Sequence, residues 1–154
     1  MKKLKFRSVK FSNKKKEINV VYITGKSIVI HYGSLGITKN IKNIRIDRET
    51  GNKSLIIEFS DGKIDYLPYD QPLHTVGDPE YILQNHVENI IARIKEVLAR
   101  KKISKKYLAR QLKTSDNQIQ RLLNPNILNK NLVQLYKLAY LLSLEFEVHL
   151  TEVA

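Results

Sequence analysis

The sequence predicts an α+β protein, with an antiparallel β-sheet domain at residues 1–76 and a helical domain at residues 77–154. In the first half, β-branched and aromatic residues alternate with polar ones, which indicates strands. Beyond about residue 76, apolar residues recur at helical spacing instead. Alternation returns in Glu145-Phe146-Glu147-Val148-His149-Leu150, which predicts a terminal strand.

The N-terminal domain is expected to be a meander of six short strands. Turn signals separate them at Gly25-Lys26, Thr50-Gly51-Asn52 and Asp61-Gly62. A sheet with one buried face needs a cover, and the helix that follows is the candidate for that role. The predicted strands are residues 4–11, 18–24, 27–32, 41–48, 53–60 and 63–69.

A long helix is predicted to begin after Asp78, which can cap it, with Pro79 at the first helical position. It should run to about Lys101, longer than most globular helices, so a break near Asn85-His86 stays open. Its apolar stripe is expected to be core: Leu83, Val87, Ile90, Ile94, Val97 and Leu98.

The formal charge of +12 over 154 residues favours a polyanionic partner. Basic residues concentrate in two regions, residues 2–16 and 93–121, and the first of these could be only a solvated tail. Charge alone does not separate nucleic acid from an anionic membrane or an acidic protein. The chain has no cysteine for disulfides, no signal-peptide pattern and no apolar run long enough to span a bilayer. We therefore expect a cytoplasmic protein that does not enter the membrane.

Catalytic constellations are not recognisable. None of the four histidines has metal-ligand spacing, and no glycine-rich phosphate loop occurs. The stretch Gly33-Ser34-Leu35-Gly36 is predicted to be a turn. The sequence thus predicts no enzyme activity, no catalytic residue, no metal and no cofactor. The histidines are His31, His74, His86 and His149.

Residues 103–124 have the pattern of a helix-turn-helix. Ser104 can cap the first helix, and Ser115 can cap the second in a capping box with Gln118. Asn124-Pro125 should end the second helix. Asn131 can cap one more helix, with a stripe at Leu132, Leu135, Leu138, Ala139 and Leu142. Within the motif the inward positions are Leu108, Leu112, Ile119 and Leu122, with Ala109 allowing close approach.

Over about residues 87–150 the chain resembles the lambda-repressor/Cro-like (XRE) helix-turn-helix family. The residues that carry the resemblance are Leu108-Ala109, Leu112, Ser115, Ile119 and Arg121-Leu122-Leu123. The run Arg121-Leu122-Leu123-Asn124-Pro125, followed by Leu132, Leu135, Ala139 and the closing strand, is similar to the helix-turn-helix of HicB-type antitoxins.

The chain departs from the family at two points. Lys113 stands where the family usually has the turn glycine, which costs about 1 kcal/mol if Lys113 takes the left-handed conformation. The predicted strand replaces the family's frequent fifth helix.

The resemblance implies that the second helix enters the DNA major groove with its N-terminus first. Asn and Gln can pair with adenine and Arg with guanine, while Asp116 could accept from cytosine or simply favour the helix dipole. The candidate base-reading residues are Asp116, Asn117, Gln120 and Arg121. The candidate phosphate contacts are Lys105, Lys106, Arg110, Lys113 and Ser115, although a solvated basic face is the alternative interpretation.

Helix-turn-helix modules usually bind palindromes as dimers, so a homodimer on double-stranded DNA is expected. The predicted terminal strand offers the contact through one face, and pairing onto the chain's own N-terminal sheet is the alternative. The candidate dimer residues are Leu144, Phe146, Val148 and Leu150.

We expect a transcriptional repressor, and the resemblance favours an antitoxin that represses its own toxin–antitoxin operon. The N-terminal domain would then bind the toxin, another partner or a small ligand, by a mode that the resemblance does not supply. The aromatic stretch from Tyr66 to His74 is either a partner-binding loop or an ordered link. The alternatives are an adaptor that binds RNA or an acidic protein and, third, a nucleic-acid enzyme.

Overall fold

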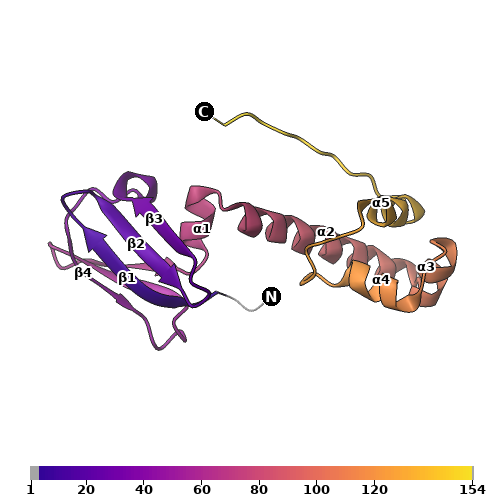
Figure 1. The fold of residues 1–154 in the computed structure, drawn as a ribbon, viewed down its shortest axis with the longest axis horizontal. Helices are drawn as coiled ribbons and strands as arrows, with labels where there is room; N and C mark the ends of the chain where they lie inside the picture. Colours follow the sequence, from indigo (N-terminus) through magenta and orange to yellow (C-terminus); the bar gives the residue numbers. More distant parts are fainter. Residues whose placement is uncertain (1–3, 154) are drawn as a thin grey trace. The chain divides into compact units, whose positions relative to one another are not determined.

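The computed structural model describes residues 4–153 and has the α+β architecture that the sequence predicts (Figure 1). It divides into two compact units, Met1–Ile82 and Leu83–Ala154. Strands β1 to β6 all lie in the first unit, and the helix-turn-helix lies in the second.

The first unit contains two separate three-stranded antiparallel sheets, not one meander. All six predicted strands form, and no end differs from its predicted position by more than two residues. The chain leaves the first sheet through a 3-10 helix, Tyr32–Leu35, and a left-handed Gly36 (φ 69°), where we expected only a turn. The first sheet comprises β1 (Phe6–Ser12), β2 (Glu17–Tyr22) and β3 (Ser27–His31); the second comprises β4 (Ile41–Ile46), β5 (Ser54–Phe59) and β6 (Ile64–Pro68).

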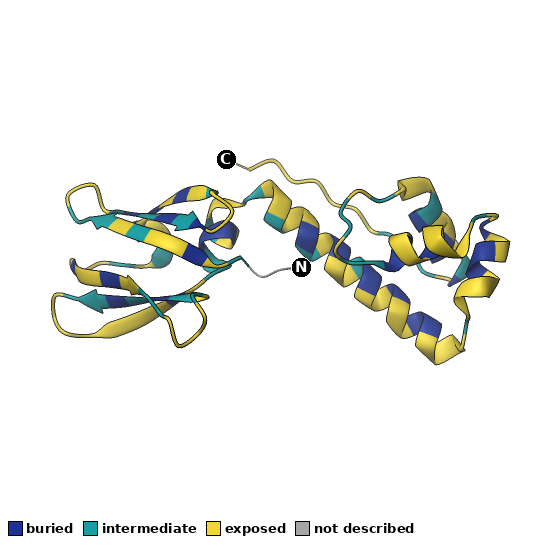
Figure 2. Ribbon diagram, turned by 60° about the horizontal axis from the view of Figure 1, so that its bottom comes forward, coloured by how far each residue is buried: buried dark blue, intermediate teal, exposed yellow. Residues whose placement is uncertain are grey.

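The buried faces of the two sheets form a single core, so each sheet covers the other (Figure 2). Phe6 and Tyr22 stack within it at 5.1 Å between ring centroids, and Leu55 is fully buried beside them in the same cluster. The expectation that the long helix covers the sheet is wrong. The short helix α1 (Gln71–Val76), which we had left as a loop, adds Leu73 to this core.

The long helix α2 (Pro79–Lys101) is continuous, so the break near Asn85-His86 does not occur. A carboxylate oxygen of Asp78 accepts a hydrogen bond from the Tyr81 backbone N–H, as expected for the cap. The stripe of α2 is buried in the helical core instead of against a sheet, except that Leu83 is exposed and Ile90 is only partly buried. The same core holds α3 (Lys105–Gln111), α4 (Asp116–Leu123) and α5 (Leu132–Leu141).

The predicted terminal strand does not form. After the bond from the Leu144 N–H to the Ala139 carbonyl, residues 145–153 make no backbone hydrogen bond within the described chain. The segment is extended but unpaired (Figure 1). A β-strand needs a neighbouring strand for its backbone hydrogen bonds, and an alternating sequence does not by itself provide that neighbour. Among residues 4–153, no helix combines the length and apolarity that a bilayer crossing requires.

Candidate nucleic-acid interface

The helix-turn-helix forms where the sequence places it. Leu108 of α3 and Ile119 of α4 are fully buried, and Ala109 lies between the two helices at 7% exposure. Ser104 accepts a hydrogen bond from the Tyr107 N–H at 3.1 Å. Ser115 accepts one from the Gln118 N–H at 3.2 Å. These contacts hold two short helices that would be marginal alone.

The capping box at α4 is only half formed, since no bond from the Ser115 backbone N–H to the Gln118 side chain occurs among the described residues. The turn itself is left-handed at Lys113, with φ 51°. The Thr114 N–H reaches the Ala109 carbonyl at 2.9 Å, which satisfies the end of α3 despite the missing glycine.

The outer face of α4 carries the candidate base-reading residues, and all of them are exposed. Asn117, Gln120 and Arg121 line one hollow of about 570 Å³, together with Lys95 of α2 and Lys105 of α3. Asp116 does not line it and sits at the first position of α4. Gln120 and Arg121 follow Asn117 by three and four residues, so all three side chains lie on one helix face. The structure therefore brings three of the four candidates together.

Exposed cations lie on α3 and in the turn before α4, and of these Lys105 lines the hollow. Lys105, Lys106, Arg110 and Lys113 are exposed, and none forms an ion pair with a described residue. The only ion pair in the described part of the helical unit joins Arg93 to Glu96. Ser115 is also exposed; its oxygen accepts the cap bond, and its O–H stays available as a donor. The uncompensated charge makes this surface suited to phosphate.

Lys130 belongs to the candidate interface, although the sequence analysis did not identify it. Its Nζ donates to the carbonyl oxygens of Arg121 at 2.7 Å and Asn124 at 2.5 Å, at the C-terminal end of α4. Burial lowers the pKa of Lys130, and the charges of Lys95 and Arg121 lower it further. A basic residue that closes on a helix C-terminus was the available signal. Lys130 lies in the loop between α4 and α5, so no helical pattern in the sequence linked it to the end of α4.

Arg121 also lines a second hollow, of about 450 Å³. Gln118, Lys130 and Gln134 are among the residues that line it. Gln118 therefore lines a concave surface next to Arg121, although the sequence had favoured a capping role for it over base reading. The Gln134 Oε1 is buried there without a hydrogen-bond donor among the described residues.

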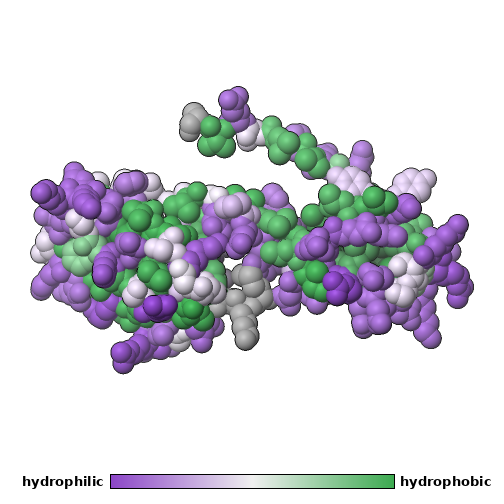
Figure 3. All heavy atoms as spheres, viewed as in Figure 1, coloured by the Kyte–Doolittle hydropathy of each residue, from purple (hydrophilic) through white to green (hydrophobic). Residues whose placement is uncertain are grey.

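The four candidate dimer residues split into two pairs. Leu144 and Phe146 pack against the helical core, and the Phe146 ring stacks on Tyr136 of α5 at 4.3 Å between centroids. Val148 and Leu150 are 67% and 96% exposed. Apolar residues are visible along this segment and over α5 (Figure 3). The exposed apolar residues of α5 are Leu132, Val133, Tyr136 and Tyr140.

Within residues 4–153, no three or more His, Cys, Asp or Glu side chains come together in a way that could hold a metal ion. No protein-family model, curated protein or solved structure matches the chain.

Proposed function

We propose that this protein is a sequence-specific DNA-binding repressor that reads its operator with α4. One observation carries the proposal: Asn117, Gln120 and Arg121 are exposed on one face of a helix whose opposite face is buried. Amide and guanidinium groups are the side chains that pair bidentately with base edges. Their exposure on a firmly packed helix is what groove reading requires.

In this proposal α4 enters the major groove with Asp116 and Asn117 leading. Gln120 and Asn117 pair with adenine, and Arg121 pairs with guanine. Lys105, Lys106, Arg110, Lys113 and Ser115 hold the phosphates on either side and set the register without reading sequence. Asp116 either accepts from a cytosine amino group or stabilises the helix dipole.

The protein acts as a homodimer, since one α4 contacts too few base pairs for a unique site. The exposed Val148 and Leu150 supply the contact, and the unpaired backbone of residues 145–153 supplies the hydrogen bonds of an intermolecular ladder. The apolar outer face of α5 lies beside the packed part of this segment, since Tyr136 of α5 stacks on Phe146.

The biological role that we propose is an antitoxin in the cytoplasm that represses its own operon. Support comes from the resemblance to HicB-type helix-turn-helix domains and from a compact N-terminal unit with its own hydrophobic core, which offers a second surface for a partner. That unit would bind the toxin, while the helical unit binds DNA.

Fluorescence-anisotropy binding to the DNA upstream of the gene and to a scrambled duplex, across a salt series, tests the proposal. A preference for the upstream DNA that persists as salt rises supports a specific autoregulator. Equal affinities that collapse together with salt would show only phosphate attraction. That result would remove the autoregulator: either the operator lies elsewhere, or the adaptor that binds RNA or an acidic protein is favoured.

A further inference from the structure

The outer face of the second sheet carries an apolar row beside a basic group. Arg45 of β4 lies directly opposite Ile56 of β5, and Ile56 lies directly opposite Tyr66 of β6. Tyr66 is 61% exposed and Ile56 is half-buried. Ile56 faces outward between Leu55 and Ile57, whose side chains are buried.

This row borders a hollow of about 950 Å³ at the neighbouring edges of β1 and β4. The two strands belong to different sheets and run side by side, linked at both ends. The Phe6 N–H donates to the Asn52 carbonyl at one end, and the Asn13 side chain bonds both the N–H and the carbonyl of Ile41 at the other. The hollow lies toward the first end.

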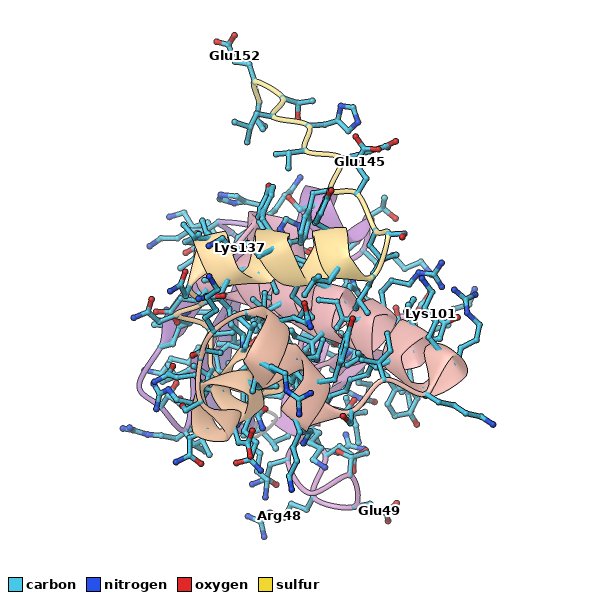
Figure 4. The ribbon with its side chains drawn as sticks, turned by 90° about the vertical axis from the view of Figure 1, so that its right-hand side faces the viewer. Arg48, Glu49, Lys101, Lys137, Glu145 and Glu152 are labelled. Atoms are coloured by element: carbon cyan, nitrogen blue, oxygen red, sulfur yellow. The ribbon has the colours of Figure 1, made fainter. Side chains whose placement is uncertain are left out.

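Three arginines line the hollow, and none has a carboxylate partner among the described residues. Arg7 comes from β1, Arg45 from β4 and Arg48 from the loop that follows β4. Figure 4 labels Arg48 and Glu49 on this loop. The ion pairs of this unit use Lys26, Lys39 and Lys42 instead.

We propose that Arg7, Arg45, Arg48, Ile56 and Tyr66 form a docking site for a carboxylate-rich segment of a partner protein. Three unpaired guanidinium groups match carboxylates bidentately. Ile56 and Tyr66 offer an apolar platform for a neighbouring side chain, and tyrosine and arginine are the residues that most often anchor protein interfaces.

Two acidic residues in the same hollow favour a protein segment over nucleic acid. Asp47 and Glu49 line it together with the arginines. Asp47 is fixed there, since its Oδ1 accepts from the Glu49 N–H at 3.0 Å. A continuous phosphate backbone would meet these carboxylates, whereas a peptide can place its acidic side chains on the arginines alone and avoid them.

The inference deepens the partner-binding role proposed for the N-terminal unit and does not depend on DNA binding. The probe is a fluorescein-labelled peptide that alternates glutamate with phenylalanine. The matched probes are the same peptide with lysine in place of glutamate and an oligothymidylate of equal length. Each is titrated with the full chain at about 0.15 M salt, where distant charges are largely screened.

The variant Arg45→Glu/Arg48→Glu alters the site. Lys14→Glu/Lys15→Glu makes the same change of charge on the exposed hairpin between β1 and β2. We expect the glutamate peptide to bind, the first variant to weaken it about tenfold or more, and the second to change it less than about twofold. Tyr66→Ala should weaken it as well, without any change of charge.

Three results would overturn the proposal: no binding of the glutamate peptide, equal loss in both double variants, or tighter binding of the oligothymidylate in competition with the peptide. Operator binding is measured on the same variants. If the operator is bound but the peptide is not, the docking site fails while the repressor stands; the reverse result leaves the docking site in place and removes the repressor.

Discussion

The side chain of Lys130 donates to the backbone carbonyl of Arg121 at 2.7 Å, so a residue outside α4 holds the helix that carries the proposed base readers. The same Nζ also reaches the Asn124 carbonyl. Carbonyls at a helix C-terminus have no partner within the helix, and a cation there satisfies them and the helix dipole together. Lys130 is therefore a positioning residue in the proposed interface.

Lys130→Met should destabilise the helical unit by about 1–2 kcal/mol, since it leaves two carbonyls without a charged donor. Operator affinity should fall with it. Urea unfolding followed by circular dichroism measures the first effect and anisotropy the second. Lys137→Met makes the same change at an exposed position of α5 and should alter neither by much. Equal behaviour of the two variants would contradict the role of Lys130.

Gln120→Ala and Arg121→Ala should each weaken operator binding by about 1–3 kcal/mol and leave random DNA little affected, since they remove base contacts only. Arg100→Ala on the exposed face of α2 removes the same charge as the arginine change and should spare operator preference. Anisotropy with both duplexes makes the measurement. An equal loss of affinity for both duplexes would contradict the base-reading assignment.

Lys105→Ala and Lys106→Ala should weaken operator and random DNA alike, since phosphate contacts are independent of sequence. Each should also reduce the magnitude of the slope of log affinity against log salt by about 1. Affinities at several salt concentrations give that slope. Lys137→Ala is the control with equal loss of charge. If the slope falls as much in this control, the effect comes from the net charge of the protein and not from phosphate contacts by Lys105 and Lys106.

Lys113→Gly should raise the stability of the helical unit by up to about 1 kcal/mol, because glycine accepts the left-handed conformation without strain. Lys102→Gly is closely matched, with φ 53° against 51° at Lys113. Both should stabilise in urea unfolding, and only Lys113→Gly should weaken DNA binding. If neither variant affects DNA, Lys113 is not a phosphate contact.

Val148→Asp and Leu150→Asp should shift the proposed dimer to monomer, since both side chains are exposed within one chain and need a partner to be buried. Sedimentation velocity measures the state. His149→Asp alters the residue between them, which an extended segment presents on the opposite face, and should leave the dimer intact. A monomeric parent protein would contradict the proposed contact directly.

The elements that could be predicted are those whose causes lie within a few residues. Ser104, Ser115 and Asn131 cap their helices as expected, because a cap bond reaches only three residues along the chain. Alternating residues and the Asp61-Gly62 turn signal likewise predicted β5 and β6, and Gly62 is left-handed in the structure (φ 85°). The exposure of Gln120 and Arg121 followed from the helical period.

The sequence alone determined strands β1 to β6, helices α2 to α5 and which side chains of α4 face outward, since short-range periodicity and capping decide them. Only the tertiary structure decided that the strands form two sheets that cover each other, and that residues 145–153 stay unpaired. It also brought Arg7 beside Arg45, and Lys130 onto the end of α4. Periodicity states which face of an element is buried; what covers that face is settled by contacts between residues far apart in the chain.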